Sequence, residues 1–412
     1  MLTRESQIAI KLEATEGTEE SLASADASGN RKNQSHRYPH EQYDREIDRA
    51  TLTELAPLRS KFGASVSWVE ELVGGSATVE APWHRSLQAM GWKKDLNSVI
   101  KAAYTDLTGT FKPGDIIGNN ATEGSATKKG RVVAFAPAST ATNAVAMVWF
   151  EQTLGTWANA DVATNYSRTG ELTVGTPADG GSMFSPQTEK NGVSPKSATV
   201  ERRLGTQRHT LVGGRGTGGL SFKHGQPVLL NCEFQGPRVW EFDNTTQSHK
   251  VREASAFANV PRVGGKPRVV QSIFLEFIEG TTSFTGVLTT FDINFGNTLA
   301  RRSTATNVDL GNSGYLPTRI TGRKITATID PEHVMPAAGF DAYAKVESGA
   351  EFRVHCRVGF PYDANGAIVV IMPSVCLDGD FENSDRDGIV TDNLTVKAVG
   401  DDDDEMYVYH IF

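Results

Sequence analysis

The stretch Phe352-Arg353-Val354-His355-Cys356-Arg357-Val358 alternates strictly between apolar and basic side chains. A period of two places every second side chain on the same side of an extended chain, so this stretch predicts a β-strand with one buried face. The same alternation recurs around Val66, Cys232, Ala327 and Val396. Turn residues separate these stretches and helical periodicity is almost absent, which is typical of an antiparallel sandwich or barrel. The chain is therefore expected to be mainly β.

One short helix is expected beside these strands, at residues 83–92. Pro82 is suited to the first turn of a helix, and Trp83, Leu87 and Met90 recur at helical spacing. Gly91 is suited to the end of the helix, where a left-handed backbone is needed. The pattern predicts an amphipathic helix that packs its apolar side on one sheet.

Two segments differ in composition from the rest. Residues 13–50 contain few aliphatic side chains, which predicts a long polar loop or an arm that is ordered only against a partner. Residues 105–177 consist of short strand-like stretches joined by Gly-rich and Asn-rich turns, which predicts a small inserted β domain. The main domain is then discontinuous and comprises residues 1–104 and 178–412.

Composition and charge exclude several classes of protein. The 412 residues carry 41 Lys and Arg against 49 Asp and Glu, a formal net charge of −8, and 38% of them are hydrophobic. That content is enough to bury a core, and the acidic balance argues against a protein whose main task is to grip phosphate backbones. No apolar run approaches the roughly 20 residues of a membrane helix. The three cysteines, Cys232, Cys356 and Cys376, lie in apolar stretches and are expected to be buried, inert thiols.

No stretch of the sequence has the pattern of a catalytic or metal site. Residues 214–219 match G-x-G-x-x-G, but a strand-like stretch follows where a dinucleotide site needs a helix, so a β-turn is favoured. His36 and His40 are the closest histidine pair and are expected to be solvated rather than to bind metal. The basic row Arg353, His355 and Arg357 favours a solvated face or a subunit contact over a nucleic-acid reader.

Two stretches of the sequence are rich in acidic residues. Residues 383–388 resemble the first half of a calcium-binding EF-hand loop, but Leu394 stands where the bidentate Glu is needed, which favours a tight Asx-rich turn. Cation binding at 378–388 is left open by the sequence. The run 401–405 is interpreted as a solvated hairpin loop or an acidic surface. The prediction is a protein with no catalytic residue, no cofactor and no metal ligand, and not an enzyme.

Taken in order, these segments resemble a known family, the major tail tube proteins of long-tailed, siphovirus-like bacteriophages. Residues 4–18 resemble its N-terminal strand and "E-T-x-x-G-T" turn, and residues 211–236 its "G-x-R-G … P … F-x-G" pattern. The strand at Trp68, the helix that follows it, and the closing strands with their acidic turn are also similar. The insert, with its stretch 111–115, looks like a small β module of phage structural proteins. This insert and the charged segment after Gly17 depart from the usual family pattern.

The resemblance implies a tail-tube-like fold of two orthogonally packed antiparallel β-sheets with a flanking α-helix, and the small inserted β domain on the tube exterior. It implies a structural virion protein that self-assembles into stacked hexameric rings, a conduit for DNA ejection into the host. Its partners would be the tape measure, tail terminator and distal tail proteins, with double-stranded DNA passing through the lumen without specific binding, and no membrane. The protein would be made in the host bacterial cytoplasm and reside in the virion tail. The acidic balance leads to the hypothesis that the lumen is net acidic.

The sequence leaves two alternatives open. The protein could instead be a tail-tip, host-adhesion or carbohydrate-binding β-sandwich, in which Trp157 and Tyr166 of the insert would stack on sugars. A chain that held two tube domains would form pseudo-hexameric rings of three copies, but the absence of an internal repeat favours six. A hydrolase has little support, because neither paired carboxylates nor a nucleophile with a base is found.

Overall fold

The chain is mainly β over the residues that its computed structural model describes, which are 6–28, 34–43, 58–73, 80–136, 146–190, 192–239, 241–243, 248–250, 252–253, 270, 274–279, 282–285, 288–303, 314–333, 341–359, 366–379 and 382–412. Long antiparallel strands and two short α-helices make up this part. The mainly β prediction is confirmed. Among the same residues, none of the helices has the length and apolar character needed to span a membrane.

The alternating stretches of the sequence meet in one central sheet. Its strands are, in spatial order, β2 (Ser35–Arg37), β4 (Leu58–Glu71), β14 (Leu229–Val239), β13 (Gln207–Lys223), β20 (Thr290–Asn294), β23 (Thr326–Ile329) and β27 (Ile389–Ala398). One face of this sheet is apolar, and its side chains include Val66, Phe222, Phe234, Ile293 and Val396, each at most 3% exposed. The period of two in the sequence therefore corresponds to a buried and an open face, as predicted.

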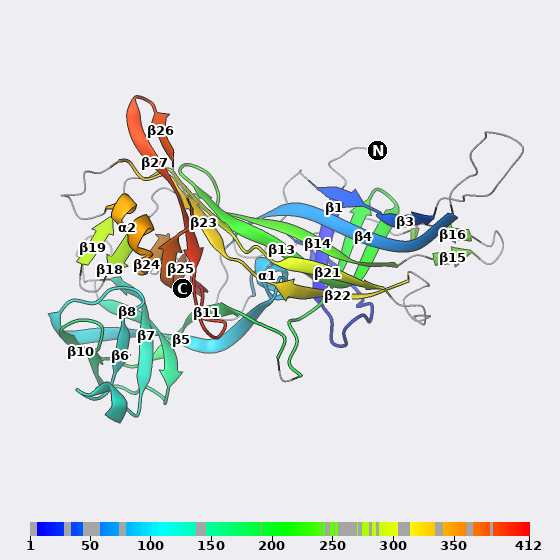
Figure 1. Ribbon diagram of the computed structural model, residues 1–412. Helices are drawn as coiled ribbons and strands as arrows, with labels where there is room; N and C mark the ends of the chain where they lie inside the picture. The colour runs from blue at the N-terminus through cyan, green and yellow to red at the C-terminus, as the bar shows by residue number, and fades with distance from the viewer. Residues whose placement is uncertain are drawn as a thin grey trace, which may run out of the picture.

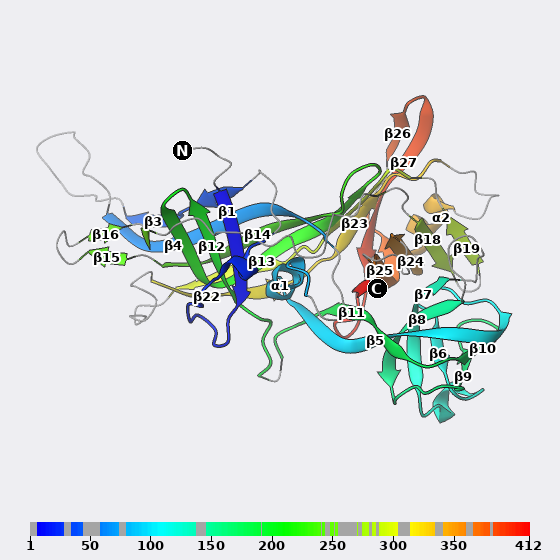
Figure 2. The same ribbon diagram turned by 180° about the vertical axis from the view of Figure 1, so that it is seen from behind.

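One end of the molecule is built on the first half of β13. There β13 pairs with β12 (Ala198–Leu204), which in turn pairs with β1 (Ser6–Leu12). Figures 1 and 2 show these strands together at one end, far from the C-terminal strands. The remaining strands here are β3 (His40–Tyr43), β15 (Glu241–Asp243), β16 (Ser248–Lys250), β17 (Arg252–Glu253), β21 (Thr298–Ser303) and β22 (Tyr315–Gly322).

The predicted helix is present as α1 (Trp83–Ala89), but it ends before the predicted residue 92, since Trp92 is the first residue of the strand β5 (Trp92–Gly109). It begins directly after Pro82, and Gly91 follows it with a φ of +84°, the left-handed backbone that glycine adopts at no steric cost. Trp83, Leu87 and Met90 are fully buried in the same core as the central sheet. The helical periodicity of the sequence therefore marks the buried side of α1.

The other end of the molecule is built on β25 (Ala367–Leu377), which pairs with β27 and with two further strands. The strands around it are β24 (Phe352–Val358), β18 (Phe274–Glu279), β19 (Thr282–Thr285), β28 (Tyr407–Ile411) and β11 (Ala178–Pro186). A second helix, α2 (Ala342–Ser348), also lies here and was not predicted. Its capping residues, Asp341 and Gly349, were visible in the sequence, but seven residues are too few for a clear helical period.

A closed six-stranded barrel is attached at this second end (Figure 1). Its strands pair in a complete circle in the order β5 (Trp92–Gly109), β8 (Met147–Leu154), β7 (Lys129–Ala136), β6 (Ile116–Gly118), β9 (Val162–Asn165) and β10 (Gly170–Val174), which returns to β5. The barrel has its own apolar core, which includes Phe150 and Leu172. Its first strand reaches back beyond residue 105, because β5 is one continuous strand that also pairs with β11.

The polar segment 13–50, for which a loop or arm was expected, contacts the body of the molecule over its described residues. Glu13 is buried, and Asp26, in a 3-10 turn (Ser24–Asp26), forms an ion pair with Arg85 of α1. The strands β2 and β3 both pair with β4. Most of these contacts are polar or backbone contacts, although Leu22 also packs on Ala9 and Tyr38 on the main core, so the low content of aliphatic residues did not indicate them.

The glycine-rich stretch 214–219 lies in the middle of β13, so the predicted β-turn is wrong. The glycines are needed because neighbouring backbones come too close for side chains. A Cβ atom on Gly218 would lie 1.9 Å from the carbonyl oxygen of Asn231, and one on Gly219 would lie 2.0 Å from that of Ile293. Glycine therefore permits close strand packing here rather than a change of chain direction.

Candidate functional site

The open face of the central sheet is the most extended functional candidate. We call it the polar sheet face. Its short polar side chains come from six adjacent strands: Ser65, Ser67, Asn231, Glu233, Gln235, Thr217, Ser221, Asp292, Asn294, Thr326, Thr328 and Thr395. The strand registers place these residues opposite one another, for example Ser67, Glu233 and Thr217 in one row. Alternation in each strand thus produces a mostly hydrophilic surface, on which the register also places the half-buried aliphatic side chains of Val69 and Leu229.

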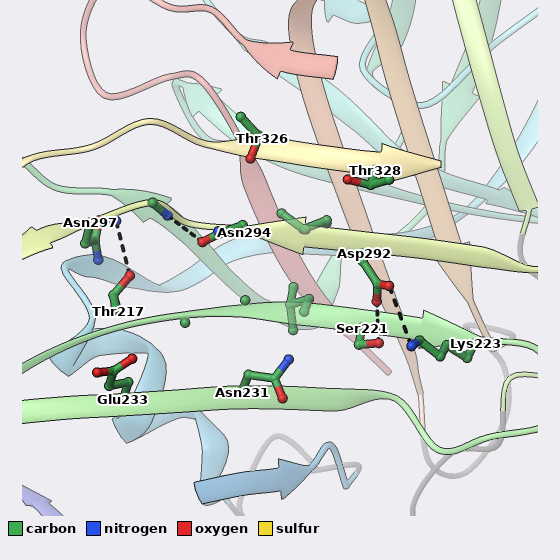
Figure 3. A pocket seen from close by; sticks show the side chains of 15 residues that line it. Thr217, Ser221, Lys223, Asn231, Glu233, Asp292, Asn294, Asn297, Thr326 and Thr328 are labelled. Atoms are coloured by element: carbon green, nitrogen blue, oxygen red, sulfur yellow. Dashed lines mark hydrogen bonds and ion pairs between the residues drawn. The ribbon is translucent and has the colours of Figure 1, made fainter. Parts of the chain in front are cut away.

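A shallow groove of about 720 Å³ lies on this face, where β13 is flanked by β14 and β20 (Figure 3). Gly219 leaves the centre of the groove without a side chain. On one side of it, Ser221 donates a hydrogen bond to Asp292, and the Nζ of Lys223 lies 3.8 Å from the same carboxylate. The groove is polar and open, and its hydroxyl, amide and carboxylate groups can hold water, but they do not form a nucleophile and base pair.

Charges on the polar sheet face balance. Glu71, Glu233 and Asp292 face the same side as Lys223 and Lys397, and Arg37 of β2 lies beside Ser65. Most of the surrounding side chains are uncharged Ser, Thr and Asn. Because affinity for nucleic acid rises with each phosphate that a cation neutralises, a face with no excess of cations offers a polyanion little grip.

The two sequence motifs that carried the family resemblance meet in a buried charged network at the β12 end. Arg215 of β13 is 1% exposed; its Nη1 donates to Glu16 Oε1 at 3.0 Å and its Nη2 to the Pro195 carbonyl at 2.8 Å. Glu13 accepts hydrogen bonds from the amides of Gly17 and Gly213, both at 2.7 Å. The turn at 13–18 and the stretch at 213–216 are almost 200 residues apart in the chain and are fixed to each other here.

Desolvation raises the pKa of Glu13, although Ser197, Gly213, Gly17 and Thr199 all donate hydrogen bonds to its carboxylate. Burial disfavours the charged form more than these donors favour it. The network is thus a structural clamp that is built from a costly buried carboxylate.

A second charged network attaches the barrel to the body. Asp115, in the turn after Pro113, is fully buried. Its Oδ1 accepts from Arg353 Nη1 at 3.0 Å, and its Oδ2 accepts from the Asn165 amide at 2.9 Å. Lys112 of the same turn donates a hydrogen bond to Glu276 at 2.7 Å. The Glu276 side chain is itself 1% exposed. The stretch 111–115 therefore forms the junction with β24 and β18.

This junction corrects the interpretation of the row Arg353, His355 and Arg357 as a solvated stripe. His355 is 1% exposed, and Arg353 is engaged by the barrel. Burial, followed by the charges of Arg357 and Lys112, lowers the pKa of His355 to about 3. Alternation correctly indicated that these side chains leave the core of the sheet, but the barrel covers them.

Further barrel contacts involve the last strand of the chain. Tyr409 of β28 is buried and donates to Glu151 Oε2 at 2.8 Å, and Arg131 donates to the same oxygen at 3.2 Å. Arg131 also lies over the ring of Tyr407, 3.9 Å from its centroid. Trp149 packs with β25 and β28 in a shared apolar cluster. Barrel and body are therefore joined by both charged and apolar contacts.

The aromatic residues proposed for sugar binding are not both available. Trp157 is 3% exposed, and its ring is packed edge-on against Phe150 within the barrel core. Tyr166 is half-buried and donates to the Asn120 carbonyl at 2.6 Å. Stacking of a sugar on Trp157 would require the barrel to open.

The acidic stretches form turns. Residues 383–388 belong to the hairpin of β26 (Glu382–Arg386) and β27, with positive φ at Asp387 and Gly388, and the Gly388 amide donates to Asp385 at 3.1 Å. The tight Asx-rich turn is confirmed. In the run 401–405, Asp403 accepts from the Thr188 amide at 3.0 Å and Asp402 pairs with Lys190, so this loop is anchored on the 187–190 segment.

The structure brings no cluster of three His, Cys, Asp or Glu together for a metal within the described ranges. Cys232 and Cys356 are buried, as predicted, and desolvation raises the pKa of both thiols; Cys376 is half-buried. His36 stacks near Tyr38 and His209, which places it against β13 instead of in solvent, and the side chain of His40 lies outside the described residues.

No protein-family model matches the chain, and a search of curated proteins gives no match.

Buried histidines predict that the protein is acid-labile. Burial lowers the pKa of His410 to about 4 and those of His355 and His36 to about 3. Between pH 6.5 and these pKa values the unfolded chain binds more protons than the folded protein does, so the free energy of unfolding must fall as the pH falls. At pH 4, His410 alone should lower the free energy of unfolding by roughly 3 kcal/mol relative to neutral pH. The raised pKa of Glu13 acts in the opposite direction.

Urea unfolding at pH 7.5, 5.5 and 4.5 measures this dependence. His410 contacts His84, with 3.1 Å between Nε2 of His84 and Nδ1 of His410. The double variant His84→Phe/His410→Phe should flatten the curve, whereas His224→Gln, at an exposed side chain, should leave it unchanged. Equal stability of the natural chain at all three pH values would contradict the prediction.

Proposed function

We propose that this protein is the major tube subunit of a bacteriophage tail, which self-assembles into stacked hexameric rings that conduct DNA. The observation that carries the proposal is the polar sheet face, a wide hydrophilic surface without excess positive charge. In a closed ring such faces would line a channel. Polyanionic DNA could pass over them without the phosphate contacts that would hold it.

The architecture supports the same proposal. An extended sheet with the helix α1 packed on its apolar side is compatible with the tail-tube-like fold, in which two sheets pack orthogonally. Edge strands that are exposed in a single copy would be paired by neighbours in a ring, which removes an aggregation hazard. Such obligate interfaces bury on the order of 2,000 Å² or more. The barrel would then lie on the exterior, since it is attached at the end opposite to β12 (Figure 2).

The proposed partners are those that the family resemblance implies: the tape measure, tail terminator and distal tail proteins, and DNA in transit. The proposed location is the virion tail. The alternative of a carbohydrate-binding adhesin keeps only Tyr166 of its two aromatic residues, because Trp157 is buried.

Negative-stain electron microscopy and light scattering of the purified chain test the assembly. Rings or hollow tubes are expected. Single cysteines test whether the polar sheet face lines the channel. In a Cys376→Ser background, one variant carries Glu233→Cys on this face and the other carries Glu123→Cys on the barrel. Both positions have exposed side chains. In assembled tubes a small maleimide should label both positions, and a large polyethylene-glycol maleimide should label the barrel position alone.

In unassembled protein both reagents should label both positions, which is the control for reactivity. A chain that stays monomeric at high concentration, also in the presence of preformed tail-tip complex, would contradict the proposal. Tubes in which the large reagent labels position 233 as readily as position 123 would show that the polar sheet face does not line the channel.

A further inference from the structure

Tyr166 lies on the outside of the barrel, over a glycine of the neighbouring strand. It follows β9 directly, and β6 is the next strand of the barrel (Figure 1). A Cβ atom on Gly118 of β6 would lie 2.6 Å from Cε2 and 2.7 Å from Cζ of the Tyr166 ring. Because Ile117 points into the barrel core, Gly118 faces outward. The missing side chain therefore lets the ring rest directly on the strand backbone.

The ring is held in one orientation. Its hydroxyl donates to the Asn120 carbonyl at 2.6 Å. The loop that carries Asn120 is itself fixed, because Asn119 Oδ1 accepts from the amides of Thr127 at 3.0 Å and Lys128 at 2.9 Å. An aromatic ring that is already fixed loses little conformational freedom when a ligand stacks on it. Tyr166 is therefore preorganised as a stacking surface.

Polar side chains stand in one row with this ring. The strand register places Gly118 between Thr164 of β9 and Lys129 of β7. Thr164 lies opposite Glu171 of β10 and donates to its Oε1 at 3.3 Å. Neighbouring strands are about 4.8 Å apart, so a hydroxyl and an ammonium group lie one strand spacing from the glycine under the ring, and a carboxylate lies two. We call Tyr166, Thr164, Lys129 and Glu171 the tyrosine platform.

The charges of the tyrosine platform select the kind of ligand. Lys129 is paired with Glu123 at 3.3 Å. Glu171 is exposed, and within the part of the chain that the structure describes its carboxylate accepts from Thr164 and forms no ion pair. Such a carboxylate repels anions and accepts hydrogen bonds from hydroxyl groups. An aromatic face, in turn, covers an apolar C–H surface. A neutral sugar ring offers both, with C–H groups on its face and hydroxyl groups at its rim.

We propose that the tyrosine platform binds a neutral pyranose oligosaccharide, with one sugar ring stacked on Tyr166 and its hydroxyl groups bonded to Glu171 and Lys129. This activity goes beyond the assembly that is proposed above and does not depend on it, because the platform lies on the barrel and not on the polar sheet face. In a tube with its barrels outside, the site would recur in every subunit, so that weak single sites could together hold a long polysaccharide.

Fluorine NMR of the full chain labelled with 3-fluorotyrosine tests the site. The Tyr166 signal is identified by its absence from the variant Tyr166→Phe. Maltotriose, cellotriose and chitotriose are the probes, and at least one should shift this signal with a Kd on the order of 1 mM, as expected for one stacked ring at an open surface.

Variants separate stacking from a purely structural role of the tyrosine. Tyr166→Leu keeps an apolar side chain over Gly118 but removes the aromatic face, and Glu171→Lys removes the acceptor. Each should weaken binding about tenfold in ligand-observed saturation-transfer NMR, whereas Tyr166→Phe, which keeps the ring, should bind within about twofold of the natural chain. The matched control is Val162→Ser, at a side chain of β9 that is 47% exposed and lies outside the row. Thermal unfolding confirms that each variant folds, and Glu171→Lys decides if Tyr166→Leu does not.

Three results would overturn the inference. The first is an unshifted Tyr166 signal with all three sugars at about twentyfold the expected Kd. The second is unchanged binding in Tyr166→Leu and Glu171→Lys, which would place the sugar elsewhere. The third is tighter binding of sulfated maltotriose than of maltotriose, which would assign Lys129 to an anion. Unassembled protein is used throughout, so sugar binding by a chain that forms no rings would support this inference while the proposed function fails, and rings that bind no sugar would give the reverse.

Discussion

Replacing Asp115 with alanine is expected to lower the free energy of unfolding by about 3–5 kcal/mol, because it leaves a buried cation without its counterion. Asp115 is fully buried and accepts hydrogen bonds from Arg353 at 3.0 Å, from the Asn165 amide at 2.9 Å and from the Lys112 backbone amide at 2.9 Å. Its loss removes one of the charged contacts between barrel and body and weakens the turn that presents Lys112 to Glu276. Chemical denaturation measures the effect.

The matched control is Asp402→Ala, at a side chain that is 81% exposed and ion-paired with Lys190. An exposed pair of this kind is worth at most about 1 kcal/mol. The double variant Asp115→Ala/Arg353→Met should lose less than the sum of the two single variants, since one of the two guanidinium groups paired with Asp115 is then absent; the other, Arg168, lies 3.4 Å from Asp115 Oδ2. A loss at Asp115 no greater than that at Asp402 would show that the buried pair does not hold the barrel.

The variant Arg215→Met is expected to cost a similar amount, about 3–5 kcal/mol, because it leaves the buried carbonyls of Pro195 and Thr318 without their donor, although Glu16 keeps Arg319 at 3.3 Å. Arg215 is 1% exposed and links Glu16 to the carbonyls of Pro195 and Thr318. Methionine fills part of the volume but satisfies none of these acceptors. The segment 13–18 should also become accessible, so protease cleavage near Glu16 should accelerate in the variant.

Arg302→Met provides a control with the same counterion. The Arg302 side chain is 41% exposed and lies 3.9 Å from Glu16, so its loss should change stability by less than about 1 kcal/mol. If Arg215→Met and Arg302→Met are equally mild, the clamp between the two motif stretches does not contribute to folding.

Local patterns in the sequence determined the strands and the first helix. The alternation around Val66, Cys232 and Val396 correctly placed one side chain in two in the core. Pro82 and Gly91 correctly bounded α1, because both act through their own backbone preferences. The Asp387–Gly388 turn followed from the same local chemistry.

Only the tertiary structure decided whether the strand face that points away from the sheet's own core is covered or open to solvent. His355 and Thr328 both alternate with core residues, yet His355 is buried beneath the barrel and Thr328 is open on the polar sheet face. A period of two reports that a side chain leaves the core of its own sheet; it holds no information on a distant segment that packs there. For the same reason the sequence could not indicate that Gly218 and Gly219 are pressed between backbones.

Local sequence patterns could not indicate the charged networks either. Asp115 and Arg353, or Glu16 and Arg215, are ordinary charged residues in their own stretches and become buried partners only through long-range strand pairing. The sequence by itself determined which residues form strands, turns and the helix α1, since these depend on neighbours along the chain. The tertiary structure decided which faces stay open and which charges are buried, because solvent exposure depends on segments that are hundreds of residues away.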